Sequence, residues 1–250
     1  MTILLRRPFA GWFILMAAVL LVVIFTPASL LAQNTLSDIL ADELDREMRQ
    51  LSAQEIPPYF IGYTVSDVHA ISISASFGAL TGSVESDSRL LTVEIRVGDY
   101  QQDNTHELRD QYDYSSSGYV LVARDDNEDA IRTAIWQETN RQYREAVERF
   151  IKVKTNVAIK VAEEDSSADF SHEPELVTYI EPPVKIASFV KDKIIWEEKV
   201  KKFSAPFLAD ENIYGGQASF SFTFTRKYLV TSEGTRTRNW KLTSKIKFKF

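Results

Sequence analysis

Residues 91–97 have the sequence Leu-Thr-Val-Glu-Ile-Arg-Val, an alternation of apolar and polar side chains that predicts a half-buried β-strand. Two earlier runs, at 59–65 and 71–78, show a similar alternation. Successive side chains of a strand point to opposite faces, so each run would place one face on a core and the other in water. Because the connections between the three runs are short, they predict an antiparallel meander.

Two more strands are predicted towards the C-terminal end of the sequence. Residues 220–224 alternate phenylalanine with serine and threonine, and residues 240–250 carry aromatic and aliphatic side chains on one face with lysines opposite. Glu233 and Gly234 lie between the two runs and predict a turn, since glycine tolerates a positive φ. These strands complete a mainly antiparallel sheet.

Two segments have the clear period of a helix. Residues 36–51 place leucine, isoleucine and methionine at spacings of three and four, and Pro57-Pro58 must lie beyond this helix because proline lacks an amide donor. Residues 125–161 form the longest helical pattern. Asp125 or Asp126 is its expected N-cap, since a carboxylate there accepts hydrogen bonds from free backbone amides.

A third, shorter helix is predicted at 186–202, with Phe189 and Trp196 facing inward. Before it, residues 163–175 are acidic and rich in serine, which predicts an exposed linker. The expected fold is therefore α+β: a mainly antiparallel sheet with one long amphipathic helix and one or two shorter helices.

Composition and charge exclude several classes of function. None of the 250 residues is a cysteine, which excludes disulfides, thiolate catalysis and cysteine-ligated metals. The net charge of −6 is uneven, because residues 33–184 carry −16 and residues 185–250 carry +8. The acidic part argues against nucleic acid as the main partner. The basic part predicts the solvated face of strands, with an anion-binding surface as the alternative.

The first 32 residues predict an export signal. Arg6-Arg7 precedes an apolar run at 9–25, and Ser29-Leu30-Leu31-Ala32 supplies a small residue for cleavage. A span of a bilayer takes about 20 residues, so a retained membrane anchor at 9–25 is the alternative. We therefore expect an exported, periplasmic protein with one domain at 33–250, which meets a membrane only if the N-terminal segment stays uncleaved.

The three histidines lack the spacing of a metal site. His172-Glu173 resembles the start of a zinc-binding helix, but Leu176 and Val177 stand where the second histidine is needed. His106-Glu107 lacks its second histidine in the same way. His69 is predicted at a strand boundary, as a surface or edge residue. The sequence therefore gives no catalytic, cofactor-binding or metal-binding residue.

Two other groups of side chains can be interpreted either as a functional site or as an ordinary structural feature. The carboxylates at 125, 126, 128 and 129 could attract calcium, but successive helical residues point in different directions, which favours a solvated helix start. Tyr112, Tyr114 and Tyr119 with Trp136 could form an aromatic recognition surface, or could cover a core from a loop.

Several short phrases, taken in order, resemble one protein family. They are Pro57-Pro58-Tyr59-Phe60, Ala75-Ser76-Phe77-Gly78, Arg96-Val97-Gly98-Asp99-Tyr100, Asp169-Phe170-Ser171, Arg226-Lys227-Tyr228-Leu229 and Thr231-Ser232-Glu233-Gly234-Thr235. Together they look like the N-terminal domain of the TldD/PmbA metallopeptidases, over about residues 36–235.

The resemblance implies an activity whose catalytic residues this chain does not contain. Full-length members of the family act as zinc metallopeptidases on peptides and pair as dimers, and some members without the zinc motif serve as the partner subunit. The family's zinc helix carries His-Glu-x-x-x-His in a later domain, whereas the fifteen residues after Thr235 hold no histidine. The resemblance thus implies a non-catalytic, exported homologue that docks a partner subunit or a second copy, or recognises a peptide.

Two alternatives remain open. The aromatic strand ending at Phe250 resembles the closing strand of an outer-membrane barrel, which would make this a structural envelope protein. The chain could also be a truncated remnant of a full-length metallopeptidase, in which case the downstream DNA would encode the zinc motif.

Overall fold

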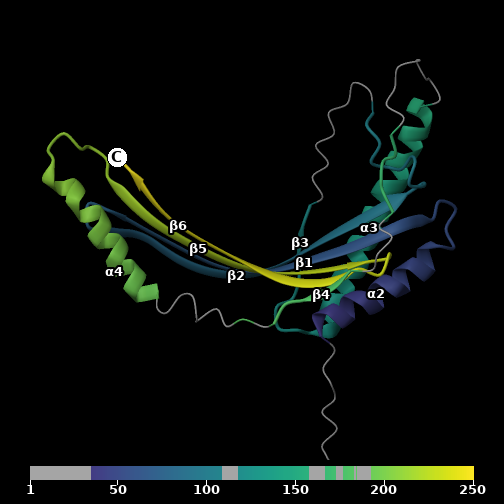
Figure 1. The fold of residues 1–250 in the computed structure, drawn as a ribbon, viewed down its shortest axis with the longest axis horizontal. Coiled ribbons are helices and arrows are strands. Elements are labelled where there is room, and N and C mark those ends of the chain that lie inside the picture. The colour runs from purple at the N-terminus through teal and green to yellow at the C-terminus, as the bar shows by residue number, and fades with distance from the viewer. Residues whose placement is uncertain (1–34, 109–117, 158–166, 173–176, 183, 185–192) are drawn as a thin grey trace, which may run out of the picture. The chain divides into compact units, whose positions relative to one another are not determined.

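Four long antiparallel strands form the frame of the protein. The computed structural model describes residues 35–108, 118–157, 167–172, 177–182, 184 and 193–250. The long strands are β1 (Pro58–Ser76), β2 (Ala79–Val97), β5 (Gln217–Thr231) and β6 (Arg236–Lys249), and the short ones are β3 (Val120–Leu121) and β4 (Thr178–Ile180). Their order in the sheet is β3-β2-β1-β5-β6-β4, and only the β4–β6 pair is parallel (Figure 1). The predicted α+β class and mainly antiparallel sheet are confirmed.

Tight turns join the long strands into two hairpins. Between β1 and β2, Phe77 and Gly78 both have a positive φ, of 48° and 81°. Between β5 and β6, Gly234 has a φ of 94° and donates its backbone N–H to the Thr231 carbonyl at 3.0 Å. The predicted turn at Glu233-Gly234 is confirmed.

The first two strands are longer than their sequence indicates. The predicted break between 59–65 and 71–78 is wrong, because β1 continues through residues 66–70. The strand predicted at 91–97 is only the last part of β2, which begins at Ala79. The meander of three strands is therefore one long hairpin. Charged residues occupy its middle, and this interrupts the alternation of apolar side chains that marks a strand.

Three α-helices accompany the sheet. They are α2 (Leu36–Leu51), which has the predicted bounds, α3 (Glu128–Val157) and α4 (Lys193–Ser204), and a short 3-10 helix, η2 (Ala205–Ala209), follows α4. The predicted aspartate caps of α3 are wrong, because the side-chain oxygen of Asn127 accepts the Ala130 amide at 3.0 Å. Phe189 lies outside the described residues, as do the predicted helical residues 158–161 and 186–192.

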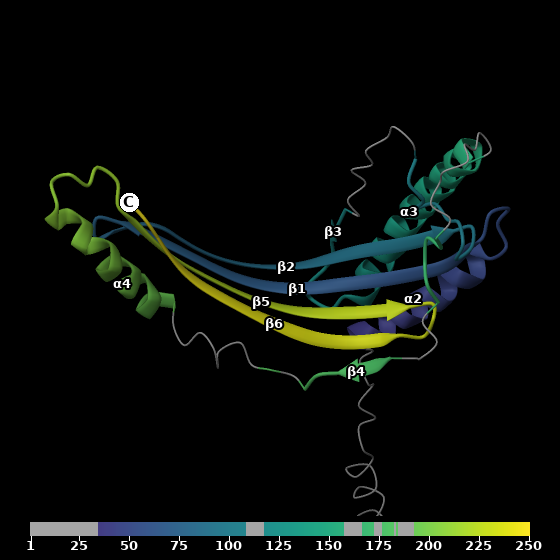
Figure 2. The ribbon, with the colours of Figure 1, turned by 45° about the horizontal axis from the view of Figure 1, so that its top comes forward.

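Two hydrophobic cores lie on the same face of the sheet. On β1, Ile61 and Val65 belong to a core with α2 and α3, whereas Ile71 and Ile73 belong to a second core that α4 covers. These four residues differ by even numbers along one strand, so their side chains point to the same face. Figure 2 shows α2 and α3 at one end of the strands and α4 at the other. We call this the helix-covered face.

Stacked aromatic rings close the second core. The Trp196 ring of α4 lies parallel to the Phe220 ring of β5, with centroids 3.8 Å apart and an interplanar angle of 3°. The predicted inward position of Trp196 is thus confirmed. Burial of aromatic rings supplies much of the apolar area of a small core.

The N-terminal predictions fall outside the described residues. Residues 1–34 contain the expected signal peptide at 1–32 and the alternative anchor at 9–25. Among the helices of the described ranges, none combines the length and the apolar character needed to cross a bilayer. Of the predicted linker at 163–175, residues 167–172 are described, and Asp169 and Phe170 are half-buried against the sheet end.

Candidate functional site

Charged side chains separate the two cores on the helix-covered face. Asp67 on β1 lies opposite Arg89 on β2 and opposite Arg226 on β5. His69 on β1 lies opposite Asp87 on β2. These residues continue the alternation of the core positions in their strands, so they share the face of the two cores. We call these five residues the polar band.

Arg89 is the most enclosed member of the polar band. Arg89 as a whole residue is 6% exposed, and its guanidinium donates to Asp67 through two nitrogens, at 2.6 and 3.2 Å. A third nitrogen donates to Asp126 and to the Ala123 carbonyl, at 2.8 and 2.9 Å. Burial alone would lower the pKa of Arg89, but the hydrogen bonds to Asp67 and Asp126 outweigh it and raise the pKa. Arg89 therefore remains a permanent cation, and each of its three guanidinium nitrogens donates to a protein partner.

His69 lies beside Arg89 in the middle of the central strand β1. Its Nδ1 atom is 2.8 Å from Asp87, and its side chain is 14% exposed. Its Nε2 atom faces Glu85 at 3.7 Å. The hydrogen bond to His69, followed by Arg124 at 3.0 Å, lowers the pKa of Asp87. The predicted strand boundary at His69 is wrong, because β1 continues through the polar band to Ser76.

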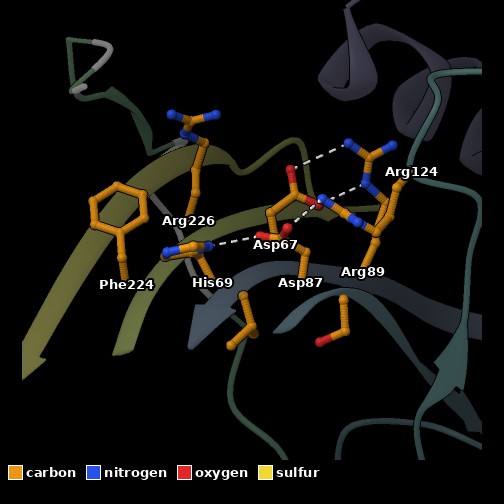
Figure 3. Close-up of a pocket in the computed structure, with 9 residues that line it drawn as sticks. Asp67, His69, Asp87, Arg89, Arg124, Phe224 and Arg226 are labelled. Carbon is orange, nitrogen blue, oxygen red and sulfur yellow. Dashed lines mark hydrogen bonds and ion pairs between the residues drawn. The ribbon is translucent and has the colours of Figure 1, made fainter. Parts of the chain in front are cut away.

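The polar band lines an open cavity of about 180 Å³ (Figure 3). Arg124, from the connection between β3 and α3, forms part of its wall, and Phe224 of β5 forms another. The Arg226 guanidinium carbon lies 5.9 Å from the centre of the Phe224 ring. Figure 3 shows dashed contacts that join Asp67 to Arg89 and Asp87 to His69, and none that reaches Arg226.

A second polar cluster holds the end of the sheet together. Asp103 is completely buried and accepts hydrogen bonds from the Tyr59 hydroxyl at 2.6 Å and from Arg96 at 2.9 Å. Its other oxygen accepts the amide and hydroxyl of Thr105, at 2.6 and 2.7 Å. The Arg96 guanidinium lies 3.9 Å from the centre of the Phe170 ring. This cluster fastens the segment 167–172 onto the strands, which is a structural role.

The other two predicted histidines form separate pairs with carboxylates. His106 lies 2.6 Å from Asp169, and His172 lies 3.0 Å from Glu233. Within the described ranges, no group of three or more histidine, aspartate or glutamate side chains is placed so that it could hold a metal ion. Glu173 lies outside those ranges.

The carboxylates at the start of α3 point to different partners. Asp126 pairs with Arg89, whereas Glu128 pairs with Arg132 at 2.7 Å. These carboxylates do not converge on one point. This agrees with the interpretation preferred from the sequence, in which they form a solvated helix start. This divergence follows from their positions, because Asp126 precedes the helix and has a positive φ of 55°.

The predicted aromatic surface is not assembled in the described residues. Trp136 is 42% exposed and lines a shallow hollow between α2 and α3 with Arg46 and Arg132. Both arginines pair with the buried carboxylate of Glu43. Tyr119 is 66% exposed and does not line this hollow. Tyr112 and Tyr114 lie outside the described residues.

Strand β6 presents an edge with two different faces. Strand β4 pairs only with Arg236–Arg238, and no strand among the described residues pairs with the outer side of residues 241–249. We call residues 241–249 the β6 edge. Its exposed lysines, at 241, 245, 247 and 249, lie on the face away from the helices, as the sequence predicted. On the helix-covered face, Ile246 and Phe248 are 44% and 52% exposed.

Comparisons with known proteins find similarity among solved structures. No protein-family model matches the sequence, and no curated protein matches it. Similar solved structures are TldE from Thermococcus kodakarensis, at 12% identity and a TM-score of 0.43, and a proposed modulator of a DNA gyrase from Thermotoga maritima, at 10% and 0.39. A third is a proposed modulator of DNA gyrase from Bacteroides thetaiotaomicron, at 14% and 0.45.

The similarity extends over most of this chain but over less than half of each solved protein. The matches cover 83%, 83% and 85% of this chain, and 38%, 38% and 40% of the other chains. This chain therefore spans about two fifths of the length of the proteins it matches. The similarity is to TldD/PmbA-type proteins, as the short sequence phrases predict, and it concerns the fold alone.

Proposed function

We propose that this chain is a non-catalytic, exported recognition module that docks an extended segment of a partner protein along the β6 edge. The observation that carries the proposal is a strand edge, unpaired by any strand of the described ranges, with lysines on one face and apolar side chains on the other. An open edge presents backbone amides and carbonyls that an added strand can pair with. Side-chain alternation along that edge then selects the added strand.

The charges of the β6 edge define the partner. An added strand places its side chains next to those of β6 on each face, and opposite charges across such a pair contribute about 0.2–1 kcal/mol each. The lysines at 241, 245, 247 and 249 therefore favour a segment with acidic residues on that face. The same segment would carry apolar residues on the other face, next to Ile246 and Phe248.

The same charges disfavour a second copy of this chain as the occupant. Two β6 strands paired edge to edge would keep their faces in register, so the lysine face of one copy would adjoin the lysine face of the other. Like charges directly opposite each other destabilise a strand pair. A partner protein with acidic residues is the better complement.

Helix α4 and the turn after it extend the apolar side of this surface. The Phe203 ring contacts the Phe248 ring edge to face, with centroids 6.2 Å apart, and the Phe207 ring lies at the same distance from Phe250. Phe203, Leu208 and Phe250 are 38%, 67% and 86% exposed. A contiguous apolar surface of this kind is typical of an interaction site.

The histidine pairs support a non-catalytic role. His69, His106 and His172 are each held by a different carboxylate, on different parts of the fold. A hydrolytic zinc centre requires several such ligands at one point. Purified chain incubated with zinc and unstructured peptides is expected to show no turnover. Metal-dependent turnover would contradict this part of the proposal.

The docking proposal is tested with two short peptides of equal length. One alternates glutamate with valine, and the other has lysine in place of each glutamate. We expect the full chain to bind the acidic peptide, and the double variant Lys245→Glu/Lys247→Glu to bind it about tenfold more weakly. The matched control, Lys152→Glu/Lys154→Glu on α3, makes the same charge change away from β6 and should bind like the wild type.

Two results would contradict the docking proposal. The first is equal binding of the acidic and basic peptides, and the second is an equal loss in the α3 control. Dimerisation of the wild-type chain that the acidic peptide prevents would identify a second copy as the occupant instead.

Export is tested separately by the mass of the protein recovered from cells. Removal of the signal peptide would give a chain that begins at Gln33. An intact N-terminus in the membrane fraction would identify residues 9–25 as an anchor, and an intact N-terminus in the soluble cytoplasmic fraction would refute export.

A further inference from the structure

We infer that the cavity of the polar band is a binding site for a single carboxylate group, held by Arg226 and Arg124. This site is distinct from the β6 edge and stands independently of the docking proposal. It is built from β1, β2, β5 and the connection before α3, on the helix-covered face between the two cores.

Arg226 provides the attraction for an anion. Asp67, which faces it across the β1–β5 pair, is already engaged through both carboxylate oxygens by Arg89. Among the residues that the structure describes, Arg226 forms no ion pair, and its guanidinium lies against the Phe224 ring. The buried ring supports the guanidinium without neutralising its charge, which leaves its hydrogen-bond donors for a ligand.

Arg124 supplies a second set of donors at the same cavity. One of its terminal nitrogens contacts Asp87 at 3.0 Å, and its side chain is 55% exposed. A guanidinium has five N–H donors in a planar fork, so this contact leaves donors for a ligand that enters the cavity. His69 completes the wall, with its Nδ1 atom turned to Asp87.

The pairing of charges favours a monoanion. Three arginines line the cavity, and Asp67, Asp87 and Asp126 equal them in number, but Asp67 and Asp126 both pair with Arg89 while Asp87 pairs with Arg124. Among the described residues, Arg226 is thus the one guanidinium of the three without a carboxylate partner. A carboxylate matches that single charge and the planar fork of arginine. A phosphate dianion would carry a second charge towards Asp67 and Asp87, which costs Coulomb energy.

The size of the cavity limits the ligand to a small group. A cavity of about 180 Å³ is below the roughly 300–1,000 Å³ of sites that enclose a whole cofactor or drug-sized molecule. It suits an acidic side chain or the terminal carboxylate of a peptide. The cavity walls come largely from strands, which hold a binding site in place more rigidly than loops do.

The experiment titrates the full chain, labelled with nitrogen-15, with four small probes. N-acetylglutamate amide presents a side-chain carboxylate, N-acetylglutamine amide is its neutral equivalent, N-acetylalanine presents a terminal carboxylate, and inorganic phosphate tests for a different anion. We expect saturable shifts of the backbone amides around 67–69, 87–89 and 224–226 with one or both carboxylates. Whichever of the two binds more tightly identifies the source of the carboxylate.

Variants then locate the site. Arg226→Gln should weaken carboxylate binding at least tenfold, and Arg226→Lys should restore only part of it, because an ammonium lacks the planar fork. Arg236→Gln on β6 is the matched control and should bind like the wild type. If Arg226→Gln does not fold, Arg124→Gln on the exposed wall gives the same test.

The proposal is overturned if neither carboxylate shifts these amides, if the glutamine probe binds equally well, or if Arg226→Gln leaves the affinity unchanged. Phosphate binding more tightly than both carboxylates would also overturn it. None of these results would affect binding at the β6 edge, because the lysine variants of β6 test that surface separately.

Discussion

The substitution Asp103→Asn tests how the end of the sheet is held together. Asp103 is fully buried and accepts four hydrogen bonds, from Tyr59, from Arg96 and twice from Thr105. Asparagine has almost the same shape, but one of its two acceptor positions becomes an NH₂ donor. If that group faces Arg96, two donors meet, and the guanidinium keeps Glu94 as its remaining carboxylate partner.

The expected loss of stability follows from these contacts. Hydrogen bonds to a charged group contribute about 1.5–3 kcal/mol and neutral ones about 0.5–1.5 kcal/mol, so converting two or three of them should cost about 2–4 kcal/mol. For a domain of this size, that corresponds to a fall in Tm of about 5–15 °C. Thermal unfolding followed by circular dichroism measures it. Asp42→Asn, at an exposed position on α2, is the control and should change the stability by less than about 0.5 kcal/mol.

The same variant should change the response to acid. Burial alone would raise the pKa of Asp103, but hydrogen bonds from Tyr59, Thr105 and Arg96 outweigh it and lower the pKa below its ordinary value of 3.8. A carboxyl group with a lowered folded-state pKa contributes stability that is complete above the unfolded pKa and is lost as the pH falls through the folded pKa. The difference between wild type and Asp103→Asn should therefore shrink below about pH 4. A loss under about 1 kcal/mol at pH 7, or a difference that does not change with pH, would refute this account.

Two further substitutions test local features of the fold. Asn127→Ala should destabilise the protein by about 1 kcal/mol in urea unfolding, because it removes the cap of α3. Asp125→Ala should cost only about a few tenths of a kcal/mol. A larger loss for Asp125→Ala than for Asn127→Ala would show that the aspartate is the cap after all. Gly98→Ala should cost more than about 2 kcal/mol, because φ is 111° and a Cβ would lie 2.6 Å from the Phe150 ring. Gly215→Ala, where a Cβ would meet nothing within 4 Å, is its control, and equal effects would contradict the steric explanation.

The elements with a continuous apolar period could be predicted from the sequence. Helix α2 has its expected bounds, since one apolar stripe runs through it to Leu51 without interruption. The turn at Gly234 was predictable because a positive φ restricts the choice of residue. The middle of β1 was not, because residues 66–70 carry Asp67 and His69 at the positions where the core alternation would need apolar side chains.

The polar band had a signal in the sequence that hydrophobic periodicity does not reveal. Asp67 and His69 are spaced by two residues, as are Asp87 and Arg89, and Phe77-Gly78 lies close to the midpoint between the two pairs. A hairpin that turns at Phe77-Gly78 brings the two pairs within one residue of facing each other, and the bulge between Ser74 and Ala75 then sets Asp67 opposite Arg89 and His69 opposite Asp87. The contribution of Arg226 could not be found in this way, because its position depends on the register of β5, which is distant in the sequence.

The same spacing explains why a long hairpin needs charged residues in its middle. Antiparallel strands can slip by two residues and keep their apolar faces aligned, so the hydrophobic pattern alone does not fix the register. A slip in one direction would place Asp67 opposite Asp87, and a slip in the other would place His69 opposite Arg89. The first slip would replace the attractive Asp67–Arg89 pair with two like charges. The second would place the Arg89 cation beside the His69 ring, which can itself be protonated.

The division of roles within the polar band follows from this argument. Asp67, Arg89, His69 and Asp87 satisfy one another across the β1–β2 pair and thereby specify its register. Arg226 lies on β5, outside that hairpin, and the Asp67 carboxylate that it faces is already engaged by Arg89. A cation at a cavity that closes no ion pair among the described residues keeps its donors for a ligand, and this is the strongest ground for assigning it to one.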